Sequence, residues 1–88
     1  MKDQFDATQM ATLDFLRTEL ETGLTFARVA LSARDEDKIR RNQLNAQKAY
    51  DTFCRYFANA AISEAESNEM HATAAELKGL LGKLDKSL

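Results

Sequence analysis

Proline, the residue that most effectively interrupts an α-helix, is absent from this 88-residue chain. Glycine occurs only three times, and helix-favouring residues such as Ala, Leu, Glu and Lys fill most other positions. The hydrophobic fraction is 44% and the charged fraction 30%, which is typical of a globular chain rather than a disordered one. We therefore predict an all-α fold without strands. The length predicts a single helical domain over residues 1–88 with one modest core.

The first predicted helix covers about residues 7–32. Asp6 is a good N-cap residue, and Gln9 stands where its capping-box partner belongs. Phe5 and Met10 occupy the two positions of a hydrophobic staple around this start. Apolar residues then recur in steps of three or four, so they share one helical face that we expect to be buried. These residues are Leu13, Leu16, Leu20, Leu24, Ala27 and Leu31.

The second predicted helix covers about residues 36–59. Three consecutive acids, Asp35 to Asp37, suit a helix start, where carboxylates meet the positive end of the helix dipole. We place a break near residues 32–35. No glycine or proline enforces this break, so one continuous helix from about residue 6 to 60, folded into a long helical hairpin, is the alternative. The expected buried residues of the second helix are Ile39, Ala46, Ala49, Tyr50, Phe53, Phe57 and Ala60.

The third predicted helix covers about residues 64–87. It follows a capping box, in which Ser63 is the N-cap and Glu66 is its partner three residues later. Its apolar residues alternate in steps of four and three, which is typical of a coiled-coil-like seam. The residues of this seam are Met70, Ala74, Leu77, Leu81, Leu84 and Leu88. Short connections favour antiparallel neighbours, so we predict an antiparallel three-helix bundle.

The inventory of reactive side chains predicts no enzyme. His71 and Cys54 are single residues on different predicted helices, and together they fit no zinc-site spacing. Di-iron bundles require two Glu-x-x-His motifs, and the one histidine here has no glutamate three residues before it. We expect Cys54 at the rim of the core and His71 at the surface. No catalytic residue, metal site or cofactor is therefore expected.

The second predicted helix carries the most distinctive charge pattern. From Lys38 onward its five basic residues stand against one acid, Asp51, in a chain of net charge −2. The four residues that we take as a candidate partner-binding stripe are Arg40, Arg41, Lys48 and Arg55. This stripe either binds phosphate or an acidic protein, or is a solvated face balanced by the acidic helices around it. The solvated face is the simpler interpretation. A pI near 5.3 makes nucleic acid an unexpected partner.

A second apolar row runs along the first predicted helix, well away from its leucine face. It consists of Phe15, Phe26, Val29 and Ala33. At 3.6 residues per turn the two rows lie roughly 150° apart, whereas the two neighbours of a helix in a three-helix bundle lie about 60° apart. The helix is therefore either sandwiched between other helices or exposed to a second chain. From this pattern we predict a homodimer that uses this row.

No apolar run approaches the ~20 residues of a membrane span, so no membrane association is expected. The first six residues lack the pattern of a secretory signal, and the single cysteine forms no internal disulfide. We accordingly expect a cytoplasmic protein.

One stretch of sequence supports a resemblance. Residues 23–27, together with Arg41-Asn42, Asn45-Ala46 and residues 48–52, resemble short, uncharacterised, all-helical bacterial proteins. The resemblance implies an all-helical fold, and it does not imply any particular activity. The Ala and Tyr placement in the second predicted helix is also faintly similar to tetratricopeptide repeats, but the helices are too long and unrepeated for their peptide binding to be carried over.

Taken together, these patterns predict a non-enzymatic helical protein–protein interaction module that self-associates. The alternative is a regulatory or nucleic-acid-associated adaptor that uses the basic face of the second helix.

Overall fold

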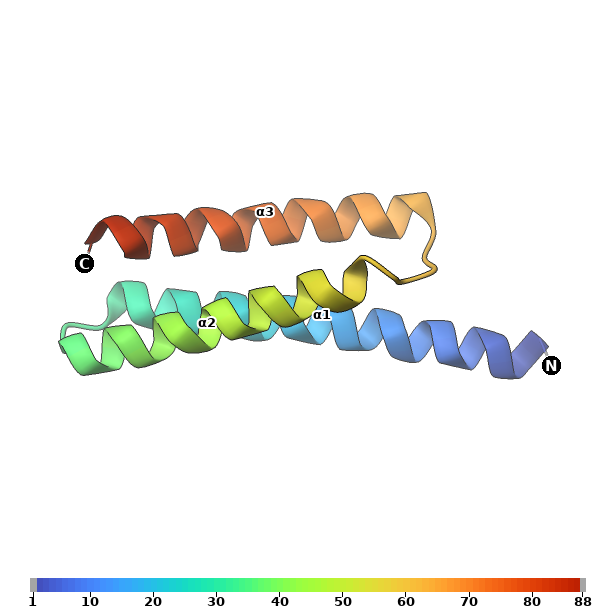
Figure 1. Cartoon of the computed structure of the whole chain (residues 1–88), viewed down its shortest axis with the longest axis horizontal. Helices are drawn as coiled ribbons and strands as arrows, with labels where there is room; N and C mark the ends of the chain where they lie inside the picture. Colours follow the sequence, from blue (N-terminus) through green and yellow to red (C-terminus); the bar gives the residue numbers. More distant parts are fainter. Residues whose placement is uncertain (1, 88) are drawn as a thin grey trace.

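The computed structural model describes the backbone of residues 2–87 and the side chains of residues 11–86. It contains three α-helices, α1 (Lys2–Ser32), α2 (Glu36–Phe57) and α3 (Glu64–Ser87). Helices α1 and α3 run in the same direction and α2 runs opposite to both (Figure 1). The predicted all-α, antiparallel three-helix bundle is thereby confirmed, and the described residues form no strand.

The break between the first two helices lies where the acidic residues predict it. Helix α1 ends at Ser32 and α2 begins at Glu36, so the continuous-helix alternative is wrong. Asp35 is the N-cap of α2, and its side chain accepts a hydrogen bond from the backbone N–H of Lys38 at 3.1 Å. Glu36 and Asp37 fill the first turn, where their carboxylates meet the positive end of the helix dipole. An acidic cap therefore starts α2 without a glycine or proline.

Two predicted helix ends differ from those observed. Helix α1 begins at Lys2, so Asp6 lies inside the helix rather than capping it. Residues 2–6 contain no glycine or proline, and nothing in this segment opposes a helical backbone. The capping and staple side chains expected there, Phe5, Asp6, Gln9 and Met10, lie outside the described side chains. Helix α2 ends at Phe57, two residues before its predicted end.

Each helix buries a seam of residues spaced alternately by three and four. The seams are Leu16, Leu20, Gly23, Ala27 and Ala30 in α1; Asn42, Ala46, Ala49 and Phe53 in α2; and Met70, Ala74, Leu77, Leu81 and Leu84 in α3. The seam predicted for the third helix is confirmed at all five described positions, while Leu88 lies outside the described residues. This spacing is the one that lets long helices pack along their whole length.

The α1 seam corrects one prediction. Leu31 is 41% exposed rather than buried, because the seam passes through Ala30 and turns Leu31 toward the surface. The seams also contain three residues that the predicted buried faces did not include, Gly23, Ala30 and Asn42. Asn42 is only 9% exposed, and its amide donates a hydrogen bond to the Lys38 carbonyl at 2.8 Å.

Gly23 marks a level at which the three helices approach one another closely. A Cβ atom placed on Gly23 would lie 2.5 Å from Cδ2 of Leu77 in α3 and 3.3 Å from Cβ of Ala49 in α2. Both neighbours belong to the buried seams, so neither has free space into which to move. The lack of a side chain at Gly23 therefore permits the spacing of the bundle at this level.

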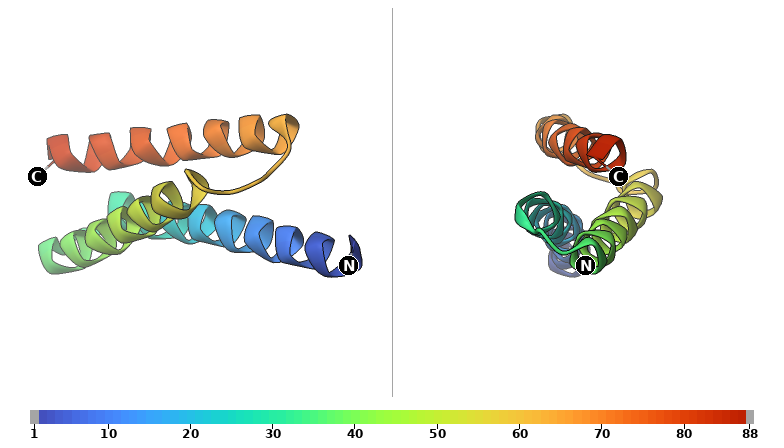
Figure 2. Two further views of the ribbon diagram at one scale, coloured as in Figure 1. Left: turned by 45° about the vertical axis from the view of Figure 1, so that its right-hand side comes forward. Right: turned by 90° about the vertical axis from the view of Figure 1, so that its left-hand side faces the viewer.

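The molecule is elongated, with extents of 51 × 19 × 17 Å. Helix α1 is the longest helix, and its N-terminal part extends beyond the ends of α2 and α3 (Figure 1). Seen end-on, α3 sits on one side of the pair formed by α1 and α2 (Figure 2). No helix in the described part of the chain is both long and apolar enough to cross a bilayer.

Candidate interaction surface

The α1–α2 pair has one broad side covered by α3 and another that no other described helix covers (Figure 2). We call the uncovered side the open face. Helical spacing and the seams assign to it residues that lie between the seam and the back of each helix, on the flank away from α3. These residues are Phe15, Thr18, Thr22 and Val29 in α1, and Arg41, Asn45, Lys48, Thr52, Arg55 and Tyr56 in α2.

An aromatic pair joins the two helices at one end of the open face. The rings of Phe15 and Tyr56 meet edge to face, with centroids 5.2 Å apart. Although they contact each other, Phe15 is 40% exposed and Tyr56 is 52% exposed. Such a pair holds α1 against α2 and still presents apolar area to the solvent.

The structure divides the predicted self-association row of α1. Phe26 is half-buried and packs against the hydrophobic core of the chain itself. Val29 is half-buried, and Ala33 lies just beyond the end of α1, where its N–H donates to the Val29 carbonyl at 3.0 Å. Phe15 is the most exposed of the four. The second row is therefore partly buried within the chain itself, through Phe26. Phe15 and Val29 contribute to the open face.

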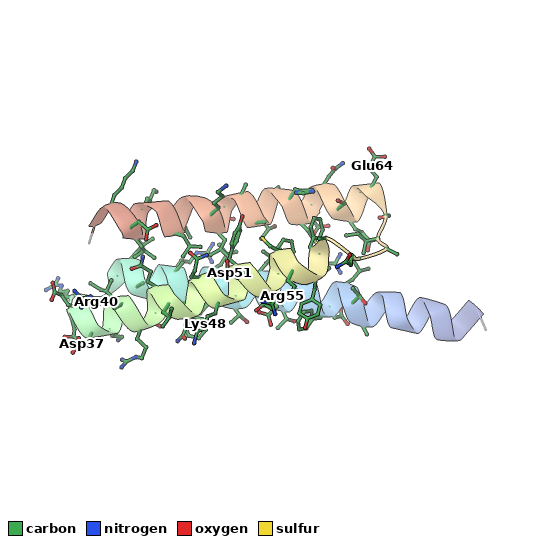
Figure 3. The ribbon with its side chains drawn as sticks, in the orientation of Figure 1. Asp37, Arg40, Lys48, Asp51, Arg55 and Glu64 are labelled. Carbon is green, nitrogen blue, oxygen red and sulfur yellow. The ribbon has the colours of Figure 1, made fainter. Side chains whose placement is uncertain are left out.

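The predicted basic stripe is also divided. Arg41, Lys48 and Arg55 are seven residues apart, are exposed and share the open face, whereas Arg40 lines a shallow groove between α2 and α3. The other residues of that groove are Gln43, Leu44, Gln47 and Asp85. In Figure 3, Lys48 points away from α3 and Asp51 lies on the side of α2 nearer to it. No ion pair joins Arg41, Lys48 or Arg55 to a described side chain.

Two acidic residues lie at the outer margin of α1, between the open face and the flank that carries Arg17, and were missed by the sequence reasoning. Asp14 and Glu21 are exposed and alternate with Thr18 and Thr25 in steps of four and three. Like Lys48 and Arg55, they are seven residues apart and make no ion pair with a described side chain. Their spacing was a detectable signal, because it equals the spacing of the basic residues on α2.

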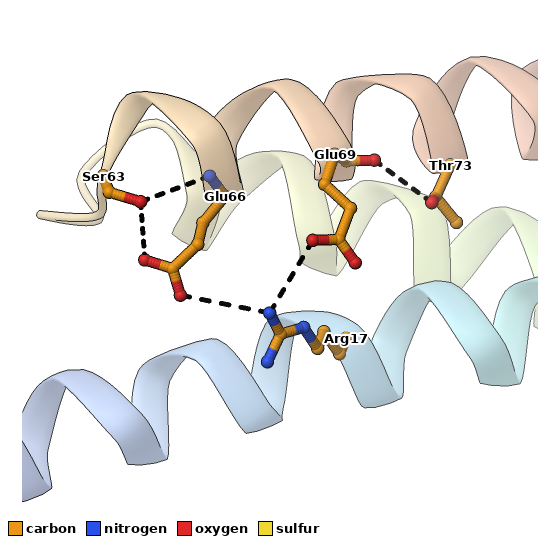
Figure 4. A network of polar contacts seen from close by, with 5 residues as sticks. All are labelled: Arg17, Ser63, Glu66, Glu69 and Thr73. Carbon is orange, nitrogen blue, oxygen red and sulfur yellow. Dashed lines mark hydrogen bonds and ion pairs between the residues drawn. The ribbon is translucent and has the colours of Figure 1, made fainter.

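The ion pairs of the described residues lie elsewhere, between α1 and α3. Arg17 lies 3.9 Å from both Glu66 and Glu69, and Arg28 lies 3.1 Å from Glu76. Figure 4 shows Arg17 reaching the start of α3. These pairs are partly exposed and individually contribute little to stability. They nonetheless neutralise acids on the α3 side, and the charges of the open face stay available.

The two reactive side chains considered above, Cys54 and His71, lie on α2 and α3. Cys54 is exposed, which corrects its predicted place at the rim of the core, and it lies beside Tyr50. Partial burial, with a hydrogen bond to Cys54, raises the pKa of the Tyr50 phenol. His71 is exposed as predicted, and its ring packs edge to face on Phe57 at 4.8 Å. Among the described side chains, no three His, Cys, Asp or Glu residues gather to hold a metal ion.

Comparison of the chain with models of protein families, with curated proteins and with solved structures gave no match.

Proposed function

We propose that the protein is a non-enzymatic protein–protein interaction module that self-associates through its open face. The observation that supports this proposal is the aromatic pair, since Phe15 and Tyr56 leave about half of their surfaces exposed at a helix–helix junction. A half-exposed pair of aromatic rings is the kind of anchor that dominates the energetics of interfaces.

The size of the open face indicates a weak and reversible contact. From Phe15 to Val29 it is about 21 Å long at 1.5 Å per residue, and the bundle is 19 Å wide. The resulting flat area of about 400 Å² is smaller than the ~800 Å² that each partner contributes to a standard interface. Burial of an aromatic side chain gains about 1.5–3 kcal/mol, and the entropy cost of association offsets several such gains. We therefore expect self-association at high protein concentration.

Sedimentation equilibrium of the full chain tests the proposal. We expect the wild-type protein to sediment as a dimer in the high micromolar range. The double variant Phe15→Ser with Tyr56→Ser should stay monomeric at the same concentration. Both residues are substantially exposed, so circular dichroism should show a helical content close to that of the wild type.

The matched control is Leu44→Ser. Leu44 is 55% exposed and lines the groove between α2 and α3 instead of the open face. This variant removes a similar apolar side chain and should sediment like the wild type. A wild-type protein that is monomeric throughout, or equal loss of association in both variants, would contradict the proposal.

The alternative is a regulatory or nucleic-acid-associated adaptor that uses Arg41, Lys48 and Arg55. The exposure of these three residues supports it. A phosphate contact would weaken steeply with added salt because counterions compete for the phosphates. Titration of the full chain with a double-stranded oligonucleotide separates the two proposals. Binding that is lost on charge reversal of these three residues would favour the adaptor.

A further inference from the structure

We propose that the occupant of the open face is a second copy of this chain, held so that α1 of each copy lies against α2 of the other. This inference rests on the proposed self-association and adds its geometry. Its basis is the distribution of charge on the open face, where the α1 margin is acidic and the α2 side is basic. Asp14 and Glu21 form the acidic margin of α1, and Arg41, Lys48 and Arg55 form the basic side of α2.

The bundle itself fixes the relative heights of these residues. Phe15 contacts Tyr56, and Gly23 lies against Ala49. Because α1 and α2 are antiparallel, Arg55 then lies at the level of about residue 16 in α1, and Lys48 at the level of about residue 24. Asp14 and Glu21 are therefore within about three residues, or ~4.5 Å along the axis, of Arg55 and Lys48.

A two-fold axis parallel to the helices and lying in the contact plane preserves these heights. It places α1 of one copy over α2 of its partner, and the reverse contact forms at the same time. The outer margins of the facing helices then lie on the same side, so that Asp14 faces the partner's Arg55 and Glu21 faces the partner's Lys48. Because the two-fold axis repeats each contact, the dimer contains four such pairs, two between Asp14 and Arg55 and two between Glu21 and Lys48.

The centre of the contact is apolar or uncharged. Phe15, Val29 and Tyr56 lie between the charged margins, together with Thr18, Thr22 and Thr52. Four antiparallel helices, two from each copy, would form the middle of the dimer, and α3 of each copy would cover the outside. Charged residues around an apolar centre give such a contact its orientation more than its strength.

Paired charge reversals test this arrangement in the full chain. One variant carries Lys48→Glu with Arg55→Glu, and its open face is acidic on both helices. The other carries Asp14→Lys with Glu21→Lys, and its open face is basic on both helices. All four residues are exposed, so folding should be retained. Each variant alone should dimerise roughly tenfold or more weakly than the wild type, because like charges meet across the two-fold axis.

The decisive measurement is the mixture of the two variants. When equal amounts are combined, each acidic helix meets a basic one, and sedimentation should recover a heterodimer. A chain that carries all four substitutions should likewise recover the homodimer. The control, Lys78→Glu with Lys86→Glu on α3, changes the net charge as much as the first variant and should dimerise like the wild type.

The outcomes separate this inference from the proposed function. A wild-type protein that stays monomeric at high micromolar concentration overturns both. Two other outcomes overturn only the placement of α1 against the partner's α2 and leave self-association in place. One is a wild-type dimer that is unaffected by either charge reversal. The other is a pair of variants that weaken the dimer but do not recover it on mixing.

Discussion

Gly23 allows the three helices to pack closely at its level in the bundle. Alanine in place of a helical glycine gains about 0.5–1 kcal/mol from the backbone alone. At Gly23 the added methyl group would meet Leu77 and Ala49, both of which are buried in the seams. Overpacking of a core typically costs about 1–3 kcal/mol, so the steric cost exceeds the backbone gain. We predict that Gly23→Ala lowers the free energy of unfolding by about 1 kcal/mol, measured by chemical denaturation.

Gly79 provides the matched control for this prediction. A Cβ atom placed there meets nothing within 4 Å. Gly79→Ala should therefore show only the backbone gain and raise the free energy of unfolding by about 0.5–1 kcal/mol. If Gly23→Ala also stabilises the protein, α1 does not approach its neighbours as closely as the structure has it.

Gly23 and Asn42 show what the sequence analysis overlooked at the residue scale. The predicted face of α1 passes from Leu20 to Leu24, which is also buried, and therefore did not include Gly23 one residue earlier. Asn42 is polar, and an apolar pattern does not include it. Its burial is tolerated because its amide bonds the Lys38 carbonyl within the same helix. Both residues do fit the alternating three-and-four spacing, which depends on position and not on residue type.

Among single helices, α3 has a start that is held by several side-chain contacts. The backbone N–H of Glu66 donates to Ser63 Oγ at 3.2 Å, and the hydroxyl of Ser63 donates to the Glu66 carboxylate at 2.7 Å. The same carboxylate reaches Arg17 of α1 (Figure 4). We predict that Ser63→Ala lowers the free energy of unfolding by about 1 kcal/mol, because an N–H at the helix start loses its acceptor.

Thr73→Ala is the control for the capping prediction, because it also removes one hydroxyl from α3. The Thr73 hydroxyl donates to the Glu69 carbonyl at 3.2 Å, and that carbonyl already belongs to the helix interior. This variant should change stability by less than about 0.5 kcal/mol, since back-bonding of this kind adds little to a helix. Equal losses in denaturation for both variants would show that the cap does not stabilise α3.

The helices were predictable from sequence because their signals are local. Asp35 and Ser63 cap α2 and α3 through residues three positions away, and the seam of α3 repeats within one segment. The start of α1 was not predictable in the same way. Asp6 has the chemistry of an N-cap, but nothing before it prevents the helix from continuing. A capping residue marks a helix start only where the preceding chain leaves the helix.

At the scale of the whole molecule, the candidate surface was only half predictable. The sequence correctly places Arg41, Lys48 and Arg55 at the surface, but the acidic margin of α1 becomes meaningful only when α1 and α2 are aligned. Phe26 illustrates the same limit, since its packing against the core depends on how the helices are arranged around it. Such relations arise from contacts between distant segments, and periodicity within one helix does not contain them.

The proposed dimer predicts that thermal stability depends on protein concentration. A second copy that binds only the folded chain stabilises it by RT ln(1 + [L]/Kd), which is about 1.4 kcal/mol at ten times Kd. For a chain of this size, 1 kcal/mol corresponds to about 4–8 °C. Raising the concentration from well below Kd to ten times Kd should therefore raise the Tm by roughly 5–10 °C in calorimetry. The Lys48→Glu, Arg55→Glu variant should rise by less than about 3 °C over the same range, because its folded monomer is intact and its contact is at least roughly tenfold weaker. An equal rise in both proteins would mean that the concentration effect does not come from the open face.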